Sequence, residues 1–472
     1  MRSSLRIGNG CGFWGDNVDA PIELARDGQL DYLTLEYLAE LTMSILALLK
    51  QRDPTAGYAH DFLGVLKRLV PSLKAQPHLK IITNAGGMNP SSCGKQARTI
   101  LDQAGLTGYK IGVVTGDDLF PHLDTLLAAG HPLTNLDTGE PLSKVRDKIV
   151  SANAYLGSQP IVEALQGGAN IVITGRVADA CLTVGPAVHE FGWQWNDWAK
   201  LSSATVAGHL IECGAQATGG LWELWDTTPD FANVGYPIAD FTPNGDFVIT
   251  KPRNSGGAVN RQTVAAQLLY EVNNPAAYYT PDVISDFTSI AVSDLGQDRV
   301  QISKAQGQPA PDKLKVSIAY RDGYISNGTL AIYGGNAAEK ARKAGQVLLD
   351  RLKRAGFTYA RTNIETIGAG SVVPLSGGRQ PPEKPGGVSL SASTQGTNVP
   401  RSENTEVMLR VTVHDASKAA VERFTKEFAP LVTAGPPGTT GYTTGRPSVK
   451  EVFAYWPALI DRRAVQGKVT WE

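Results

Sequence analysis

The sequence has few cysteines, no long apolar run and no excess of charge of either sign. Its four cysteines, Cys11, Cys93, Cys181 and Cys213, lie far apart and form no C-x-x-C pair, which argues against a disulfide framework or a structural zinc site. No apolar stretch reaches the roughly 18 residues of a membrane span, and none follows the N-terminal arginine as in a signal peptide. These absences predict a cytoplasmic protein with no bound metal and no membrane contact.

The charge balance excludes further classes of partner. The formal net charge is -1, with 42% hydrophobic and 19% charged residues, which is typical of a folded globular protein. No basic excess is present for nucleic acid, whereas a small acidic ligand needs only a local basic pocket. At about 100–200 residues per domain, the 472 residues predict two lobes. We therefore expect a small-molecule substrate and a homo-oligomer, with no nucleic acid partner.

The first lobe is predicted over residues 1–220, where strand-like and helix-like segments alternate. Near-continuous apolar runs predict five strands, in the segments LRIGN, LDYLTLEY, LKIITNAGG, KIGVVTGDD and ANIVITGR. Amphipathic segments such as DFLGVLKRLVPSLKA separate them. This order predicts an α/β fold, a Rossmann-like doubly wound and mostly parallel sheet.

The second lobe is predicted over residues 246–472, after an aromatic, proline-bearing connection at 221–245. The segment KLKVSIAYRDGYISNGTLAIYGG predicts two strands joined by glycine-containing turns, and the helix-like AAEKARKAGQVLLDRLKRAG follows. This mixture indicates an α+β lobe. A stretch rich in proline, glycine and serine at 371–403 predicts a surface excursion.

The first candidate site is the loop after the first strand, where Gly10–Gly15 matches the pattern G-x-G-x-x-G. Glu36, about 20 residues further on, stands where a ribose-binding acid belongs in a dinucleotide fold. Against a dinucleotide, Phe13 and Trp14 are bulky, an aspartate follows the last glycine, and the next helix begins late, near residue 19. We interpret the loop as one wall of a pocket, with Gly10 and Gly12 allowing the turn and the two rings lining or closing the site.

The loops after the other four strands, at 36–37, 84–89, 115–118 and 174–179, are predicted to meet this one, because ligands bind at the carboxyl ends of parallel strands. Asn84, Gly86, Gly87 and Asn89 follow the third strand, where they could hold a phosphate or carboxylate or simply form a capped helix start. Arg176 and Asp179 follow the fifth strand. The arginine could clamp a carboxylate through two hydrogen bonds, or the two residues could pair only with each other.

The helical segment GHLIECGAQATGG offers the most reactive side chains. His209 is three residues before Glu212 and four before Cys213, so all three lie near one helix face. The histidine could lower the pKa of the thiol, or act with Glu212 as an acid–base pair, or begin a metal site. An apolar stripe on the same segment also allows Cys213 to be a plain buried residue.

The second lobe offers two weaker candidates. Ser255, Gly256 and Gly257 precede a helix and could cradle an anion. Arg446 lies in a turn-rich loop and could supply a positive charge, although such arginines often pair at the surface.

Several long segments together resemble the acyclic terpene utilisation (AtuA) family. They are RIGNGCGFWGD, DYLTLEYLAELTMSILA, GHLIECGAQATGG, GGAVNRQTVAAQLLYEVNNPAAYYTPDV and APLVTAGPPGTTGY with RPSVKEVFAYWP, in family order. The resemblance implies a catabolic enzyme for citronellol- or geraniol-type terpenes or other organic acids, with a branched acyl-CoA as substrate and lyase or hydratase chemistry. It implies no catalytic residue. Many longer relatives carry a C-terminal ferredoxin-like domain, so a separate ferredoxin-like small subunit is a possible partner.

Three functions follow from these observations. The first is a lyase or hydratase in which His209 and Glu212 transfer protons while Arg176 and the glycine loops hold anionic groups. The second is an NAD-dependent oxidoreductase, based on the Gly10–Gly15 match. The third is a non-catalytic, CoA-thioester-binding subunit of a two-protein enzyme.

Overall fold

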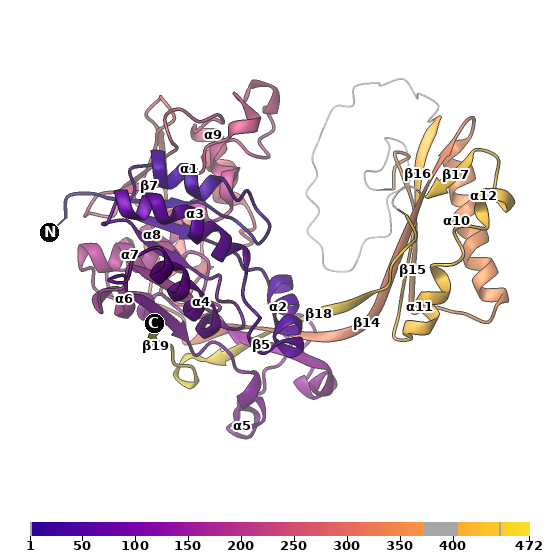
Figure 1. The fold of residues 1–472 in the computed structure, drawn as a ribbon, viewed down its shortest axis with the longest axis horizontal. Coiled ribbons are helices and arrows are strands. Elements are labelled where there is room, and N and C mark those ends of the chain that lie inside the picture. The colour runs from indigo at the N-terminus through magenta and orange to yellow at the C-terminus, as the bar shows by residue number, and fades with distance from the viewer. Residues whose placement is uncertain (1, 372–404, 443–444) are drawn as a thin grey trace. The chain divides into compact units, whose positions relative to one another are not determined.

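The computed structural model describes residues 2–371, 405–442 and 445–472, and divides them into two compact units (Figure 1). One unit comprises Met1–Tyr320 with Tyr455–Glu472, and the other comprises Arg321–Ala454. The sequence-based boundaries at residues 220 and 246 both fall inside the first unit. The excursion predicted at 371–403 lies, from residue 372 onward, outside the described residues.

Five parallel strands form the centre of the first unit. They are β1 (Leu5–Asn9), β2 (Tyr32–Leu35), β3 (Lys80–Thr83), β4 (Ile111–Thr115) and β6 (Ile171–Thr174), arranged in the order β1-β2-β3-β6-β4. The sequence predicted all five, because each is an apolar run whose side chains are buried on both faces of the sheet.

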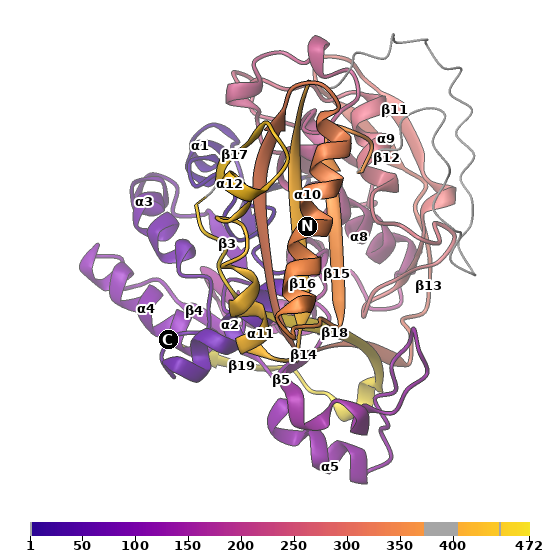
Figure 2. The same cartoon turned by 90° about the vertical axis from the view of Figure 1, so that its right-hand side faces the viewer.

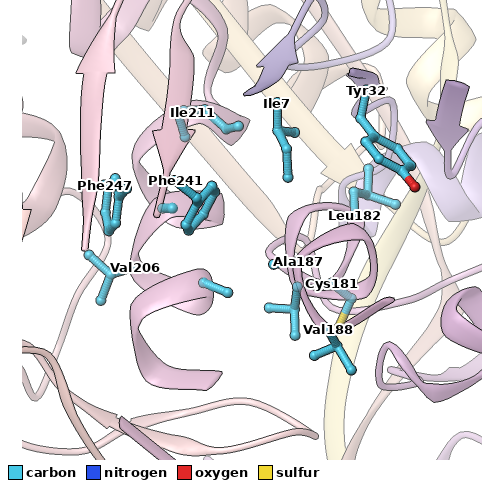
Figure 3. Close-up of a cluster of buried hydrophobic side chains, with 14 of the residues drawn as sticks. Ile7, Tyr32, Cys181, Leu182, Ala187, Val188, Val206, Ile211, Phe241 and Phe247 are labelled. Atoms are coloured by element: carbon cyan, nitrogen blue, oxygen red, sulfur yellow. The ribbon is translucent and has the colours of Figure 1, made fainter. Parts of the chain in front are cut away.

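Helices cover both faces of these strands. The helices α1 (Ala20–Asp27), α3 (Asp61–Ala75) and α4 (Pro90–Gln103) share a core with Leu33 and Ile81. The helices α6 (Gln159–Gln166), α7 (Cys181–Phe191) and α8 (Trp198–Glu212) pack on the opposite face. In Figure 3, Ile7 and Tyr32 belong to this second core, together with Leu182 of α7 and Val206 of α8. Successive side chains of one strand enter different cores because they point to opposite sides of the sheet.

Antiparallel strands extend the same sheet at both edges, which corrects the prediction of a mostly parallel sheet. Beyond β1 follow β7 (Ile238–Phe241), β8 (Phe247–Thr250), β12 (Val300–Ser303) and β11 (Ala291–Asp294), and β19 (Lys468–Trp471) pairs with β4. The strand β1 therefore has a parallel neighbour on one side only, so a Rossmann-like order is not confirmed. The added strands were not predicted because each has only four residues and is interrupted or flanked by polar residues.

Smaller elements complete the first unit. They are α2 (Glu40–Arg52), α5 (Leu123–Ala128), β5 (Ile149–Ala154), α9 (Arg261–Leu269), and a three-stranded sheet of β9 (Tyr278–Tyr279), β10 (Ile284–Asp286) and β13 (Gln306–Gln308). The prediction of two strands after residue 312 is wrong, because one continuous strand, β14 (Lys313–Tyr333), spans that segment. Gly323, with φ of +88°, marks the place where β14 changes partner from β5 to a strand of the second unit instead of turning back.

The second unit is an antiparallel sheet with helices on one face (Figure 2). Its strands are the later part of β14 with β15 (Arg361–Ile367), β16 (Glu406–Asp415), β17 (Thr439–Tyr442) and the first part of β18 (Lys450–Asp461). The helices are α10 (Ala337–Arg354), α11 (Lys418–Phe424) and α12 (Leu431–Ala434). Leu348 of α10 and Phe424 of α11 pack on Leu409 of β16. In the described part of the chain, no helix is long and apolar enough to cross a membrane.

Candidate functional site

A cavity of about 1280 Å³ lies in the first unit, where the parallel strands end. Residues that follow β1, β2 and β6 line it, together with the end of α8 and the segment 278–281. This is the edge at which open α/β sheets bind ligands. Of the residues singled out in the sequence, the cavity brings together Gly12, Phe13, Glu36, Arg176, Asp179, His209, Glu212 and Cys213.

The other candidates do not line this cavity. Gly10, Trp14, Asn84, Gly86, Gly87, Asn89, Ser255, Gly256 and Gly257 support the surrounding loops of the first unit, and Arg446 is an exposed residue of the second unit. Trp14 packs edge-on against His60, with ring centroids 5.4 Å apart. Its ring therefore serves a contact between loops.

The Gly10–Gly15 loop bonds to its own protein. The Gly12 backbone N–H donates to Asp16 Oδ2 at 2.7 Å, and Tyr236 donates its hydroxyl to the other oxygen of that carboxylate at 2.6 Å. A Cβ at Gly12 would lie 2.7 Å from the backbone nitrogen of Gly214, so the glycine is needed for contact with the segment after α8. The helix α1 begins only at Ala20. Internal packing therefore explains the glycine pattern, and the Gly12 N–H is not available to a pyrophosphate.

The loop after β3 is a helix start that also holds Glu36. Asn89 accepts a hydrogen bond from the Ser92 N–H and caps α4. A Cβ at Gly86 would lie 2.5 Å from the carbonyl oxygen of Thr174, so this glycine allows a close contact with β6. Asn84 donates to Glu36 Oε1 through its Nδ2, and its Oδ1 accepts the Tyr37 N–H at 2.8 Å. Gly87, with φ of +48°, completes the turn.

The segment before α9 is also bonded internally. Ser255 donates its hydroxyl to the Pro252 carbonyl at 2.6 Å, and the Val259 N–H donates to the Asp298 carboxylate at 2.8 Å. A Cβ at Gly256 or Gly257 would lie 2.1 or 2.3 Å from a backbone carbonyl oxygen. The N–H groups of Ser255, Gly256 and Gly257 donate to backbone carbonyls of the protein, so they are not available to an external anion.

Arg176 is the buried cation of the cavity, with a side chain only 2% exposed. Its Nη2 pairs with Asp179, and its guanidinium carbon lies 4.2 Å from the centre of the Tyr155 ring. The Nε and Nη1 groups have no hydrogen-bond partner among the described residues. Buried donors are normally satisfied, so these two groups are candidates for binding a ligand. The Nε–H bond points away from Nη1, so the two groups are separate donors, each suited to one oxygen of a ligand.

Asp117 fixes the backbone of Arg176. Its Oδ2 accepts the Arg176 backbone N–H at 2.8 Å and an N–H of Asn153 at 2.9 Å. Burial raises the pKa of Asp117 to about 6, and these hydrogen bonds oppose the rise. The loop after β4 was expected at this edge, but no local signal distinguished Asp117 from the neighbouring Asp118.

His209 and Glu212 form the proton-carrying pair of the cavity. His209 Nε2 lies 2.9 Å from the Gln267 carbonyl oxygen, and Nδ1 lies 3.1 Å from Glu212 Oε1. Since a carbonyl only accepts, we assign a proton to Nε2. The contact of Nδ1 with Glu212 then needs a second proton, carried by one of the two residues. Glu212 Oε2 has no partner among the described residues.

The pKa directions agree with this geometry. Burial would lower the pKa of His209, but the hydrogen bond and charge of Glu212 outweigh it and raise that pKa. Burial also raises the pKa of Glu212, and His209 opposes the rise. The end of α8 is fixed by Asn9, whose Nδ2 donates to the carbonyls of Ile211 and Glu212 at 2.8 and 3.1 Å. No local sequence pattern indicates this role for Asn9.

Cys213 is not activated by the histidine. Both ring nitrogens of His209 bond to other groups, and burial together with the charge of Glu212 raises the pKa of the thiol. A nucleophilic cysteine requires the opposite shift. Of the alternatives for His209, the structure therefore favours the pairing with Glu212 over activation of Cys213.

A second charged cluster lines the cavity, and the sequence did not predict it. Tyr155 donates its hydroxyl to Glu40 Oε1 at 2.7 Å, and Lys315 donates to the same oxygen at 3.0 Å. Burial raises the pKa of Glu40, but Lys315 and Tyr155 outweigh it and lower that pKa to about 2. These residues come from α2, the end of β5 and β14, so only the tertiary fold brings them together.

The cavity also carries an apolar rim of exposed side chains, including Phe13, Leu221 and Tyr279. Within the described part of the chain, no group of three or more His, Cys, Asp or Glu side chains is arranged to hold a metal ion. The chemistry offered by the protein's own residues is therefore a carboxylate-binding arginine beside buried carboxyl groups that can carry protons.

Comparison with known proteins assigns the chain that contains this cavity to a family. Residues 5–471 match the model described as "Acyclic terpene utilisation family protein AtuA". No curated protein and no solved structure gives a match. The matched range covers essentially the whole chain, including all the residues that line the cavity. The chain therefore belongs to the acyclic terpene utilisation (AtuA) family.

Proposed function

We propose that this protein is an enzyme of terpene or organic-acid degradation that acts on a branched acyl-CoA or related carboxylic acid by lyase or hydratase chemistry. Family membership supports the metabolic role. The observation that supports the reaction is that Arg176 and Glu212 line the same cavity and that each has buried polar atoms without a partner among the described residues.

Arg176 binds and orients the substrate. Its positive charge attracts a carboxylate, and its Nε or Nη1 group donates a hydrogen bond to an oxygen of that carboxylate or of a thioester carbonyl. The Tyr155 ring and the contacts of Asp117 and Asp179 keep the guanidinium in place before a ligand arrives. Binding therefore requires little rearrangement, which favours a reactive orientation of the carbon next to the carboxyl group.

Glu212 exchanges a proton with that carbon. Its Oε1 contacts His209, so Oε2 is the oxygen available to a ligand. His209 shares the proton of the pair and does not itself contact the ligand through a ring nitrogen, because both are already bonded. Positioned proton transfer of this kind contributes roughly 10²–10⁴-fold to a rate. Glu212 is thus the acid–base residue and His209 its positioning partner.

Turnover by the purified chain tests this proposal. The protein is incubated with branched 3-hydroxyacyl-CoA thioesters and with the matching free acids, and loss of water or carbon–carbon cleavage is followed by mass spectrometry. Glu212→Gln is expected to lower kcat by at least 10²-fold with little change in melting temperature. Full turnover by that variant contradicts the assignment. Turnover by the wild-type chain alone excludes the non-catalytic subunit.

Carboxylate binding is tested separately by calorimetry with 3-methylbutanoate. Arg176→Lys keeps the charge but loses the planar guanidinium and its Nε and Nη1 donors, so we expect at least tenfold weaker binding. Equal affinity in both proteins would remove Arg176 from the role.

A further inference from the structure

Glu36 has an unusual hydrogen-bonding pattern for a buried carboxyl group. It follows β2, is only 3% exposed and lines the same cavity as Arg176. Its Oε1 accepts two hydrogen bonds, from the Leu38 N–H at 2.9 Å and from Asn84 Nδ2. Its Oε2 has no partner among the described residues. One oxygen is fixed by the protein, and the other is left for a ligand.

This pattern determines where a proton can reside. Both partners of Oε1 are N–H groups, which only donate, so a neutral Glu36 carries its proton on Oε2. The surroundings favour the neutral form. Burial and the charge of Asp179 raise the pKa of Glu36 well above its ordinary value, while Arg176 and the two hydrogen bonds oppose the rise.

We propose that Glu36 is a second proton-transfer residue of the cavity, which donates its Oε2 proton to an oxygen of the ligand held by Arg176. This inference rests on the proposed function and divides the proton transfers between two carboxyl groups. Charge on Asp179 influences both Glu36 and Glu212, so both act within its electrostatic range.

For loss of water from a 3-hydroxy acid, the step balances as follows. Glu212 Oε2 takes the proton from the carbon next to the carboxyl group, and the electrons of that bond form the carbon–carbon double bond. The carbon–oxygen bond breaks, and the hydroxyl leaves as water with the proton of Glu36. Glu36 is left as a carboxylate near Arg176, and exchange with solvent restores both residues. Hydration runs the same transfers in reverse.

A small aryl diazoacetamide tests the transferable proton without any substrate. The reagent takes the proton of a neutral carboxyl on its diazo carbon, loses N₂, and forms an ester with the resulting carboxylate. We expect peptide mass spectrometry at pH 7 to show the ester on Glu36. Glu40 is the internal control: it lines the same cavity and is more exposed, but its pKa is about 2, so it remains ionised and unlabelled.

The labelling result decides the inference without requiring a variant to fold. Absence of the ester at Glu36, or labelling no faster than at Glu40, overturns it. Labelling of Glu36 combined with no 3-methylbutanoate binding in calorimetry would instead overturn the proposed function and leave Glu36 as a proton donor to the cavity. Glu36→Gln serves as the matched variant for turnover. Its amide still donates a hydrogen bond but transfers no proton, so kcat is expected to fall roughly 10²–10⁴-fold with little change in KM.

Discussion

Asp117 makes the stability of the first unit depend on pH in a direction opposite to that of most carboxyl groups. Its pKa is about 6 in the folded protein, against an ordinary value of 3.8. Below about pH 4 both folded and unfolded chains keep the proton. Between these two values only the folded protein keeps it, so the free energy of unfolding falls as pH rises and the loss is complete above about pH 6. The difference of about two pH units corresponds to about 3 kcal/mol.

Asp117→Asn isolates this contribution. The amide has no proton to lose, and its oxygen can still accept the hydrogen bonds from Arg176 and Asn153. Urea unfolding of both proteins is followed by tryptophan fluorescence between pH 4 and 7.5. Across this range, the free energy of unfolding of the wild type is expected to fall by about 3 kcal/mol relative to that of the variant. Subtraction removes the other titrating groups, which both proteins share.

An exposed carboxyl group provides the control for this experiment. Asp124 pairs with Arg146 at the surface, and the hydrogen bond from that arginine lowers its pKa, so Asp124→Asn should show no loss of wild-type stability with rising pH. If the difference between wild type and Asp117→Asn stays constant within about 1 kcal/mol, or rises with pH, the burial argument for Asp117 is wrong.

Three further predictions follow from the packing of the site. Gly12→Ala places a Cβ 2.7 Å from the Gly214 nitrogen and should lower the free energy of unfolding by about 1–3 kcal/mol. Gly64→Ala, where nothing lies within 4 Å of the added Cβ, should raise it by about 1 kcal/mol. Thermal unfolding measures both effects, and equal effects contradict the packing argument. Asn9→Ala leaves the carbonyls of Ile211 and Glu212 without their donor and should lower stability by about 1–3 kcal/mol, measured by urea unfolding; an unchanged midpoint would remove its role. Lys315→Met removes the cation that keeps Glu40 ionised, so the diazoacetamide should then label Glu40 at pH 7, and no label there would show that Tyr155 alone suffices.

The sequence predicted the part of this site that depends on local pattern. The five parallel strands are apolar runs, and their ends mark the loops that meet at one edge. Arg176 was found because it lies just past such a run, and Glu36 because it ends another and lies about 20 residues after the glycine loop. His209 and Glu212 were found because a spacing of three residues on a helix brings side chains together.

The rest depends on contacts between residues far apart in the chain. Tyr155, Glu40 and Lys315 meet only because β5 pairs with β14, and nothing near any of them in the sequence indicates this pairing. The same holds for Asn9, whose partners lie about 200 residues away at the end of α8. The Gly10–Gly15 pattern resembled a dinucleotide-binding loop for a related reason. A tight turn and a close backbone contact select glycine whether the neighbour is a pyrophosphate or, as at Gly12, the protein's own chain.

Electrostatic balance explains how one buried cavity can keep both a cation and transferable protons. Arg176 pairs with Asp179, whose negative charge balances its positive charge. Arg176 therefore lowers the pKa of the other nearby carboxyl groups less than an unpaired arginine would. The charge of Asp179 in turn favours the neutral forms of Glu36 and Glu212. Glu40 lies beside Lys315 and is ionised. Removing Asp179 would therefore leave Arg176 unbalanced and lower the pKa of Glu36. Burial is the largest cause of the raised pKa of Glu36, so Asp179→Asn should slow diazoacetamide labelling at Glu36 while leaving Arg176 able to bind 3-methylbutanoate. Labelling at the wild-type rate would show that burial alone keeps Glu36 neutral.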